Sequence, residues 1–141
     1  MKSLIIVILL FSGVLAYQQP DQYKLARDHM VDSQIAARGI SHQATLQSMR
    51  KVPRHLFVPA SIESEAYSDR PLPIGYKQTI SQPLIVAHMT ALARPAKGKK
   101  ALEIGTGSGY QAAVLAEIVD TVYTIEIVPE LAKESAARLK T

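Results

Sequence analysis

Three alternating glycines between two apolar runs constrain this chain more than any other feature. The first run, residues 101–104, contains Glu103, and the glycines follow at positions 105, 107 and 109. A helical pattern covers residues 110–119, and a second apolar run at 121–127 contains Glu126. This order of strand, glycine turn, helix, strand and acid is typical of a nucleotide-binding βαβ unit. The sequence therefore predicts an α/β fold with parallel strands at 100–104 and 121–127.

The spacing of the glycines favours a nucleoside ligand without phosphates. A dinucleotide site has the pattern G-x-G-x-x-G, but Tyr110 stands where its third glycine would fall. A pyrophosphate prefers a helix N-terminus without nearby anions, whereas Glu103 precedes this turn, and residues 105–126 contain no Lys or Arg. S-adenosylmethionine fits better, because its sulfonium is positive and its ribose offers two hydroxyls to Glu126. Ordinary turn glycines and a nicotinamide dehydrogenase site, which Tyr110 disfavours, are the alternatives.

Four segments share the motifs of one known enzyme family. Residues 102–111, LEIGTGSGYQ, are similar to its first methyltransferase motif. Residues 72–83, LPIGYKQTISQP, are similar to a signature that general methyltransferases lack, and the TISQP part makes the match specific. Residues 52–59, VPRHLFVP, and residues 30–40 are similar to its N-terminal helices. With these segments, the chain resembles the protein-L-isoaspartate O-methyltransferases, which run well past its length.

The resemblance implies a fold, a reaction and a set of site residues. The fold is that of a Rossmann-like class I S-adenosylmethionine-dependent methyltransferase. The family methylates the misplaced carboxylate of isoaspartyl residues in aged proteins, and the ester then collapses to a succinimide that can reopen to aspartate. Isoaspartyl-containing proteins and peptides are thus the implied partners. By position, Ser81 is the active-site serine, and the cofactor-site residues are Thr79, Glu103, Gly105, Gly107, Ser108, Gly109 and Glu126.

The polar residues of this set also have interpretations that need no ligand. Ser81 precedes a helical stretch with a proline in its first turn, which is an N-cap pattern, and Thr79 suits an ordinary extended segment. Glu126 could be a surface acid at a strand end, but its spacing from the glycines favours a ribose ligand. Glu103 favours a site, because a lone charge inside a buried strand is costly. Ser81 is not interpreted as a nucleophile, because no base neighbours it in the motif.

The first residues are typical of a secretory signal. Lys2 precedes an uninterrupted apolar run at residues 4–11, which is too short for a comfortable membrane span, and a small-residue cleavage pattern ends at Ala16. We therefore expect residues 1–16 to be a signal peptide and the mature protein to be periplasmic or secreted, without stable membrane association. The alternatives are a retained anchor, a core helix, and the cytoplasmic location that is usual for the family.

Upstream of the glycines, the pattern predicts a helical cap and family-specific loop over residues 17–99. The first predicted helix covers residues 21–38, with Asp21 as N-cap, Leu25, Val31 and Ile35 on the apolar face, and Gly39 as the stop. The second runs from Ser41 to before Pro53. The third follows Ser81 and has an apolar stripe of Leu84, Ile85, Val86, Met89 and Leu92. Four prolines predict an irregular segment over residues 54–75.

Residues 100–141 are expected to form the first part of the S-adenosylmethionine-binding Rossmann-like domain, with a last helix from Pro129. Two parallel strands alone leave both faces and both edges in need of cover. The expected architecture is therefore an incomplete doubly wound parallel sheet with an N-terminal helical cap, the front of a larger domain.

Composition narrows the chemistry further. The chain of 141 residues has a net charge of +4, and its tight basic cluster, Lys97, Lys99 and Lys100, suits a solvated linker, so no nucleic-acid partner is expected. The absence of cysteine excludes a thiol nucleophile and a thiolate metal site, and the four histidines show no metal-ligand spacing. No metal is expected. The alternative to an enzyme is a truncated, catalytically inactive exported module that binds a nucleoside.

Overall fold

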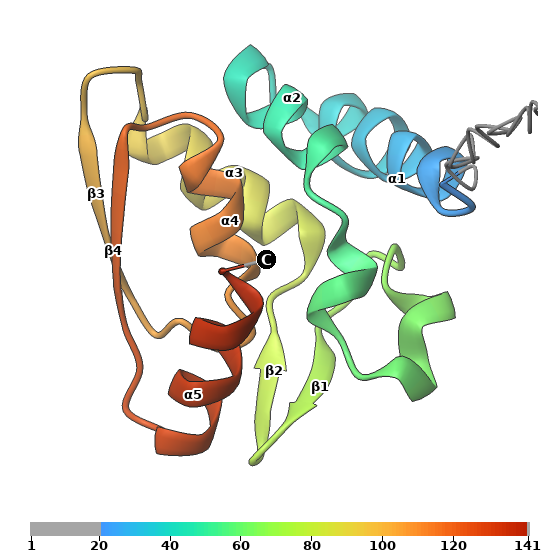
Figure 1. Ribbon diagram of the computed structural model, residues 1–141. Coiled ribbons are helices and arrows are strands. Elements are labelled where there is room, and N and C mark those ends of the chain that lie inside the picture. The colour runs from blue at the N-terminus through green and yellow to red at the C-terminus, as the bar shows by residue number, and fades with distance from the viewer. Residues whose placement is uncertain (1–20, 141) are drawn as a thin grey trace, which may run out of the picture.

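The computed structural model describes residues 21–140, so the expected signal peptide at residues 1–16 lies outside the described part of the chain. Figure 1 shows the arrangement of its helices and strands. Their order is α1 Lys24–His29, η1 Met30–Ile35, η2 Ala36–Arg38, α2 Gln43–Lys51, η3 Arg54–Phe57, η4 Ala60–Glu65, β1 Leu72–Gly75, β2 Gln78–Ile80, α3 Pro83–Ala93, β3 Lys100–Ile104, α4 Tyr110–Ala116, β4 Thr121–Ile125 and α5 Pro129–Arg138. Between residues 21 and 140, no helix combines the length and apolar character needed to cross a membrane.

The first cap helix consists of three consecutive hydrogen-bonding patterns. The α-helical turns of α1 pass into the π-helical η1 and then the 3-10 turn η2, and Gly39 ends the helix with a left-handed φ of 95°, as predicted. The predicted start is wrong: the helix begins at Lys24, because the Asp21 carboxylate accepts a hydrogen bond from Tyr23 N (3.0 Å) and fixes a turn there. Leu25 is 83% exposed and does not belong to the apolar face.

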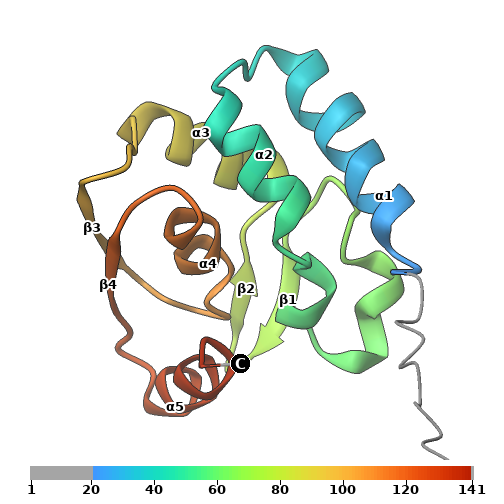
Figure 2. The same cartoon turned by 45° about the horizontal axis from the view of Figure 1, so that its top comes forward.

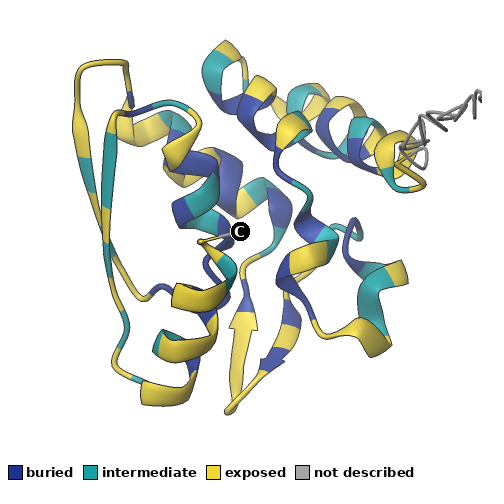
Figure 3. Ribbon diagram, in the orientation of Figure 1, coloured by how far each residue is buried: buried dark blue, intermediate teal, exposed yellow. Residues whose placement is uncertain are grey.

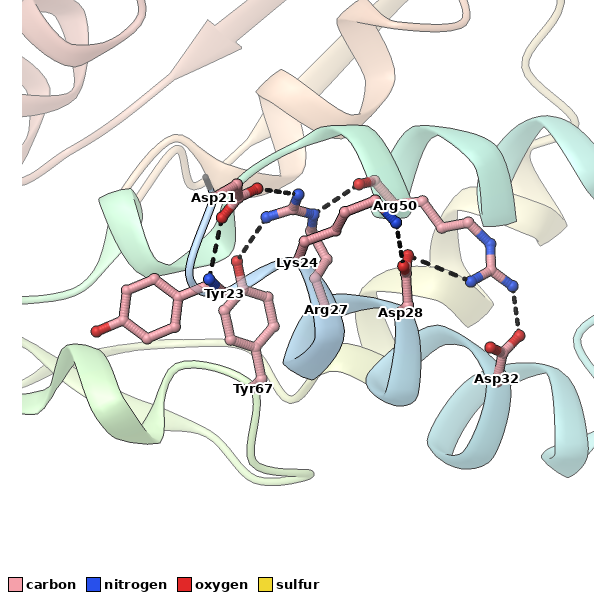
Figure 4. A network of polar contacts seen from close by, with 8 residues as sticks. All are labelled: Asp21, Tyr23, Lys24, Arg27, Asp28, Asp32, Arg50 and Tyr67. Atoms are coloured by element: carbon pink, nitrogen blue, oxygen red, sulfur yellow. Dashed lines mark hydrogen bonds and ion pairs between the residues drawn. The ribbon is translucent and has the colours of Figure 1, made fainter. Parts of the chain in front are cut away.

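A polar network attaches this helix to α2 and to the segment around Tyr67 (Figure 4). The buried Arg27 side chain donates from Nε to the Arg50 carbonyl (2.6 Å) and from Nη1 to Tyr67 Oη (3.2 Å), and it forms an ion pair with Asp21. At the surface, Arg50 Nη2 lies 2.5 Å from an Asp32 carboxylate oxygen. Exposed pairs of that kind contribute little stability, so Arg27 is the main polar anchor of the cap.

An antiparallel hairpin that the sequence did not predict follows the 3-10 segments. β1 pairs with β2, with Leu72 opposite Ile80. At its tip, Tyr76 and Lys77 have left-handed φ angles of 52° and 59°, and Tyr76 Oη donates to the Glu134 carboxylate of α5 (2.7 Å). The hairpin places Thr79, an exposed residue at the centre of β2, in the lining of a hollow beside the glycine turn.

The chain then enters α3, whose sequence prediction was partly wrong. Its N-cap residue is Gln82 and not Ser81, with Pro83 in the first turn, so the capping interpretation of Ser81 does not hold. The buried face of α3 consists of Pro83, Val86, Ala87 and Thr90. Of the predicted stripe only Val86 is buried, whereas Ile85, Met89 and Leu92 are 44%, 45% and 69% exposed.

The βαβ unit forms in the predicted order, with β3 and β4 paired in parallel and α4 between them, but α4 ends at Ala116 and β4 at Ile125, before the predicted ends at residues 119 and 127. Helices α3 and α4 lie on one side of the strand pair in both Figure 1 and Figure 2. Because side chains alternate along a strand, four apolar residues share the other face. They are Leu102, Ile104, Tyr123 and Ile125, each between 55% and 73% exposed, and Figure 3 shows β3 and β4 in the colours of exposed and intermediate residues, with none buried. Within the described residues, the parallel sheet is thus an incomplete one of two strands.

One hydrophobic core joins the cap to the βαβ unit. Buried residues of the first helix, such as Met30 and Ile35, belong to the same cluster as Tyr110 and Val114 of α4 and Leu131 of α5. The hydrophobic packing is thus continuous across residue 99, where the sequence suggested a boundary between cap and βαβ unit. That boundary remains a prediction from the sequence.

Candidate cofactor site

The glycine turn between β3 and α4 adopts a backbone that only glycine takes up readily. Gly105, Gly107 and Gly109 have φ angles of 92°, 53° and 90°, in the left-handed region that other residues enter at a cost. At Gly109 a Cβ would also lie 3.2 Å from Leu139 Cγ, so the Leu139 side chain would have to shift to admit a larger residue. The turn is tied to β4, since Gly105 N donates to the Ile125 carbonyl (2.7 Å).

Glu126, just after β4, points its carboxylate at this turn. Its Oε2 accepts a hydrogen bond from Gly107 N (2.7 Å), and its Oε1 accepts one from Val128 N (2.9 Å). These two backbone donors, Val128 first and then Gly107, lower the pKa of Glu126 below its usual value. The structure therefore holds an ionised acceptor beside the glycines, where the spacing in the sequence placed it.

Glu103 supplies a second carboxylate with the opposite pKa shift. It lies on β3 directly opposite Thr124 of β4, whose hydroxyl donates to it. Burial raises the pKa of Glu103, and the nearby charge of Glu126 adds to this, while the Thr124 hydrogen bond opposes both. The site thus contains two unlike carboxylates: Glu126 loses its proton at lower pH than usual, and Glu103 retains its proton to higher pH.

A hollow beside the turn collects most of the predicted site residues. Six of the predicted site residues line it: Thr79, Ser81, Glu103, Gly105, Gly107 and Ser108. The other two, Gly109 and Glu126, lie outside the lining. Its volume is about 60 Å³, and a larger adjoining hollow of about 430 Å³ shares Ser81, Glu103 and Gly105 with it. The hairpin end therefore faces the glycine turn, although some 25 residues separate them in the sequence.

Sequence reasoning missed several polar residues of the site. Gln111 lines both hollows, and although its Nε2 donates to Thr90 Oγ1 (2.7 Å), its buried Oε1 has no hydrogen-bond partner among the described residues. Thr124 and Thr106, whose hydroxyl oxygens lie 2.6 Å apart, were also missed. The parallel register that pairs Glu103 with Thr124 was the available signal.

These residues suit a cationic nucleoside with hydroxyl or amino donors. The two carboxylates and the orphaned Gln111 oxygen are acceptors, and a buried acceptor without a donor is costly. The turn offers backbone N–H groups as donors. Within residues 21–140, no three metal-ligating side chains lie together. The βαβ unit with this glycine turn has the fold of a Rossmann-like methyltransferase.

Comparison with known proteins gives the family. The family model described as protein-L-isoaspartate(D-aspartate) O-methyltransferase (PCMT) matches residues 25–141. A relative from Opitutus terrae named protein-L-isoaspartate O-methyltransferase is 60% identical over 114 residues, which cover 81% of this chain and 49% of the relative. The chain belongs to the protein-L-isoaspartate(D-aspartate) O-methyltransferase family, and it spans about half the length of the curated relatives it matches.

Two solved structures have the same fold. A protein-L-isoaspartate O-methyltransferase aligns with a TM-score of 0.72 and 24% identity, over 81% of this chain and 38% of its own. A Plasmodium falciparum beta-aspartate methyltransferase, solved in complex with S-adenosyl-L-homocysteine, aligns with a TM-score of 0.68 and 23% identity, over 81% of this chain and 55% of its own. These similarities confirm the predicted Rossmann-like methyltransferase fold.

Proposed function

We propose that this chain takes part in methyl transfer from S-adenosylmethionine to the carboxylate of L-isoaspartyl residues in damaged proteins. The observation that carries the proposal is the ionised Glu126 carboxylate held against the glycine turn by Gly107 N and Val128 N. Family membership supports the same reaction, and so does the neighbouring structure with bound S-adenosyl-L-homocysteine. The partners of the reaction would be isoaspartyl-containing proteins and peptides.

The residues of this chain would divide the binding of the donor among them. S-adenosylmethionine, when bound, would supply an electrophilic methyl group on a sulfonium. Glu126 would accept hydrogen bonds from the ribose hydroxyls, because its pKa is lowered and it stays ionised. Gly105, Gly107, Ser108 and Gly109 would allow close approach of the ligand to the backbone. Glu103 and Thr79, which both line the hollow, would complete the cofactor site.

The acceptor chemistry makes modest demands on the protein. A carboxylate has a pKa near 4 in water, so an isoaspartyl side chain is already ionised at pH 7. In-line attack on the methyl group then needs no strong base, and the main requirement is alignment of the reacting atoms. Ser81, which is exposed and lines the hollow, would orient the acceptor by a hydrogen bond and would not act as a nucleophile.

A transfer assay tests the proposal. The chain is incubated with S-adenosylmethionine labelled in its methyl group and with an isoaspartyl peptide, beside a twin peptide that contains aspartate. We expect label in the first peptide alone. Equal or absent labelling of both peptides would contradict the proposal, and binding of S-adenosylhomocysteine by calorimetry without transfer would support the alternative, an inactive nucleoside-binding module.

We also propose that the protein is exported to the periplasm or secreted. The support comes from the sequence, in which Lys2 precedes the apolar run at 4–11 and a small-residue pattern ends at Ala16. Cell fractionation with N-terminal sequencing tests this proposal: the expected mature chain begins at Tyr17. A chain found in the cytosol with its first residues intact would contradict it.

A further inference from the structure

We infer that Arg54 is a positioning residue that sets Ser81 against the glycine turn. The inference deepens the proposed function and rests on it, because it assigns Ser81 the orienting role given above. Arg54 begins η3, within the VPRHLFVP segment, and its residue exposure is 0%. No role for this arginine followed from the sequence pattern alone.

The Arg54 side chain contacts three separate segments of the chain. Its Nε donates to the Ala66 carbonyl (2.7 Å), and its Nη2 donates to the Ser81 carbonyl (2.8 Å). Its guanidinium carbon lies 4.8 Å from the centre of the Tyr110 ring, an arrangement typical of a cation–π contact. Tyr110 directly follows the glycine turn, so this one side chain connects the turn to the Ser81 backbone.

Burying the Arg54 guanidinium costs free energy that an apolar side chain in the same place would not. A buried charge is costly unless an ion pair compensates it, and among residues 21–140 no carboxylate forms an ion pair with Arg54. Its Nη1 and the Tyr110 hydroxyl interact electrostatically with each other, but neither atom has a hydrogen-bond partner at ordinary distance and angle among the described residues. An apolar side chain of similar size would pack at lower cost. The guanidinium is therefore better explained by the geometry that it imposes on its neighbours.

The contact with the Ser81 carbonyl bears on where Ser81 lies relative to the glycine turn. Ser81 lies between β2 and α3, outside any hydrogen-bonded ladder or helix. The other side-chain contact that holds this connection is Gln82 Nε2, which donates to the Asp69 carbonyl (3.1 Å). The glycine turn, in contrast, is held by β4 and Glu126. Loss of the guanidinium would thus free Ser81 while the turn stays in place.

The test compares Arg54→Lys and Arg54→Gln with the surface control Arg50→Lys. Lysine retains the charge and glutamine retains an N–H donor, but neither can reach both carbonyls and the ring together. Arg50 is a suitable control because it is an arginine that pairs with Asp28 and Asp32 at the surface, away from the hollow. Each variant is measured as the whole chain, with backbone order parameters from NMR and with methyl-transfer kinetics.

Without any ligand, we expect lower order parameters at residues 80–82 in both Arg54 variants, with unchanged values in β3 and β4. In the transfer reaction, we expect kcat to fall about tenfold, the equivalent of one charged hydrogen bond, while the Kd for S-adenosylhomocysteine changes less than about threefold. Ser81→Ala should then have little further effect in the Arg54→Lys background, because coupled residues are not additive. Arg50→Lys should change none of these quantities.

Unchanged order parameters at residues 80–82 would overturn the role of Arg54, even if the chain transfers methyl groups. Full additivity with Ser81→Ala would do the same. If neither Arg54 variant folds, the arginine belongs to the folding core and the positioning role is wrong. A chain that shows the mobility change but never methylates an isoaspartyl peptide would instead refute the proposed function, and would leave Arg54 as the residue that orders Ser81.

Discussion

The two walls of the hollow are built in different ways. The turn wall, defined as residues 105–109 together with Glu126, which supports the turn from outside the lining of the hollow, is held by contacts within one βαβ unit, such as the Glu126 carboxylate with Gly107 N. The loop wall, defined as residues 79–81, depends on Arg54 of η3, which lies 27 residues before Ser81 in the sequence. One wall is therefore a local property of its sequence, and the other is a property of the assembled cap.

This difference suggests a division of labour. A wall fixed by its own backbone suits a donor that every reaction shares, because its geometry survives changes elsewhere in the protein. A wall positioned from the cap suits the acceptor side, where the reacting carboxylate must be aligned with the methyl group. Changes in the turn wall should therefore alter stability and donor affinity together, whereas changes in the loop wall should alter mainly the rate of transfer.

The largest effect is expected from Gly109→Ala in the turn wall. Alanine at a left-handed φ of 90° costs about 1–2 kcal/mol, and its Cβ would lie 3.2 Å from Leu139 Cγ, so the loss of unfolding free energy should be at least that large. Gly98→Ala is the matched control, because Gly98 has a φ of 83° but no atom near its Cβ position. Urea unfolding should show the greater loss for Gly109→Ala, and only that variant should bind S-adenosylhomocysteine more weakly. Equal losses would mean that the contact with Leu139 is unimportant.

A smaller effect is expected from the protonation of Glu103. The pKa of Glu103 is raised and that of Glu126 is lowered. As the pH increases from about 4, Glu103 should therefore lose its proton after Glu126 does. Donor affinity should therefore rise with pH as Glu103 loses its proton, by about tenfold, the gain from one hydrogen bond to a charged group. Calorimetry with S-adenosylmethionine between pH 4.5 and 7 measures this rise, and Glu103→Gln should remove most of it. The same slope in both proteins would exclude Glu103 from the donor site.

The smallest effect is expected from Ser81→Ala in the loop wall. One lost neutral hydrogen bond is worth about 0.5–1.5 kcal/mol, which should slow transfer to the isoaspartyl peptide about threefold to tenfold. Donor affinity should change less than about twofold, since the turn wall is untouched. Ser64→Ala, at an exposed serine of η4, is the control. A drop in donor affinity larger than the drop in transfer rate would contradict the division between the walls.

The turn wall could be predicted from the sequence because its signals are local. The glycines, the flanking apolar runs and Glu126 lie within about 25 residues, and the bounds of β3 agree with the prediction. Errors occurred where a local signal competed with another contact. Asp21 looks like an N-cap, but its carboxylate fixes a turn with Tyr23 and forms an ion pair with Arg27. Leu25 matches the helical period but faces solvent.

The loop wall could not be derived from residue patterns alone. The prolines at 71 and 73 argued against strands, yet a two-stranded hairpin tolerates them, since proline is accommodated at edge positions. Ser81 matched a capping pattern, but the helix takes Gln82 as its N-cap, and the Ser81 carbonyl is instead bound by Arg54. Only the family signature marked these residues as a site, because the partners that hold them are distant in sequence.

The central claim, that the glycine turn and Glu126 together bind a methyl donor, is tested most directly by calorimetry. S-adenosylhomocysteine is titrated into the whole chain, into Glu126→Ala and into the control Glu130→Ala, which changes an exposed acid in the first turn of α5. We expect binding by the unaltered chain and by the control, and a Kd about 10- to 100-fold higher for Glu126→Ala, the equivalent of a hydrogen bond to a charged group. An unchanged Kd in a folded Glu126→Ala protein would contradict the claim.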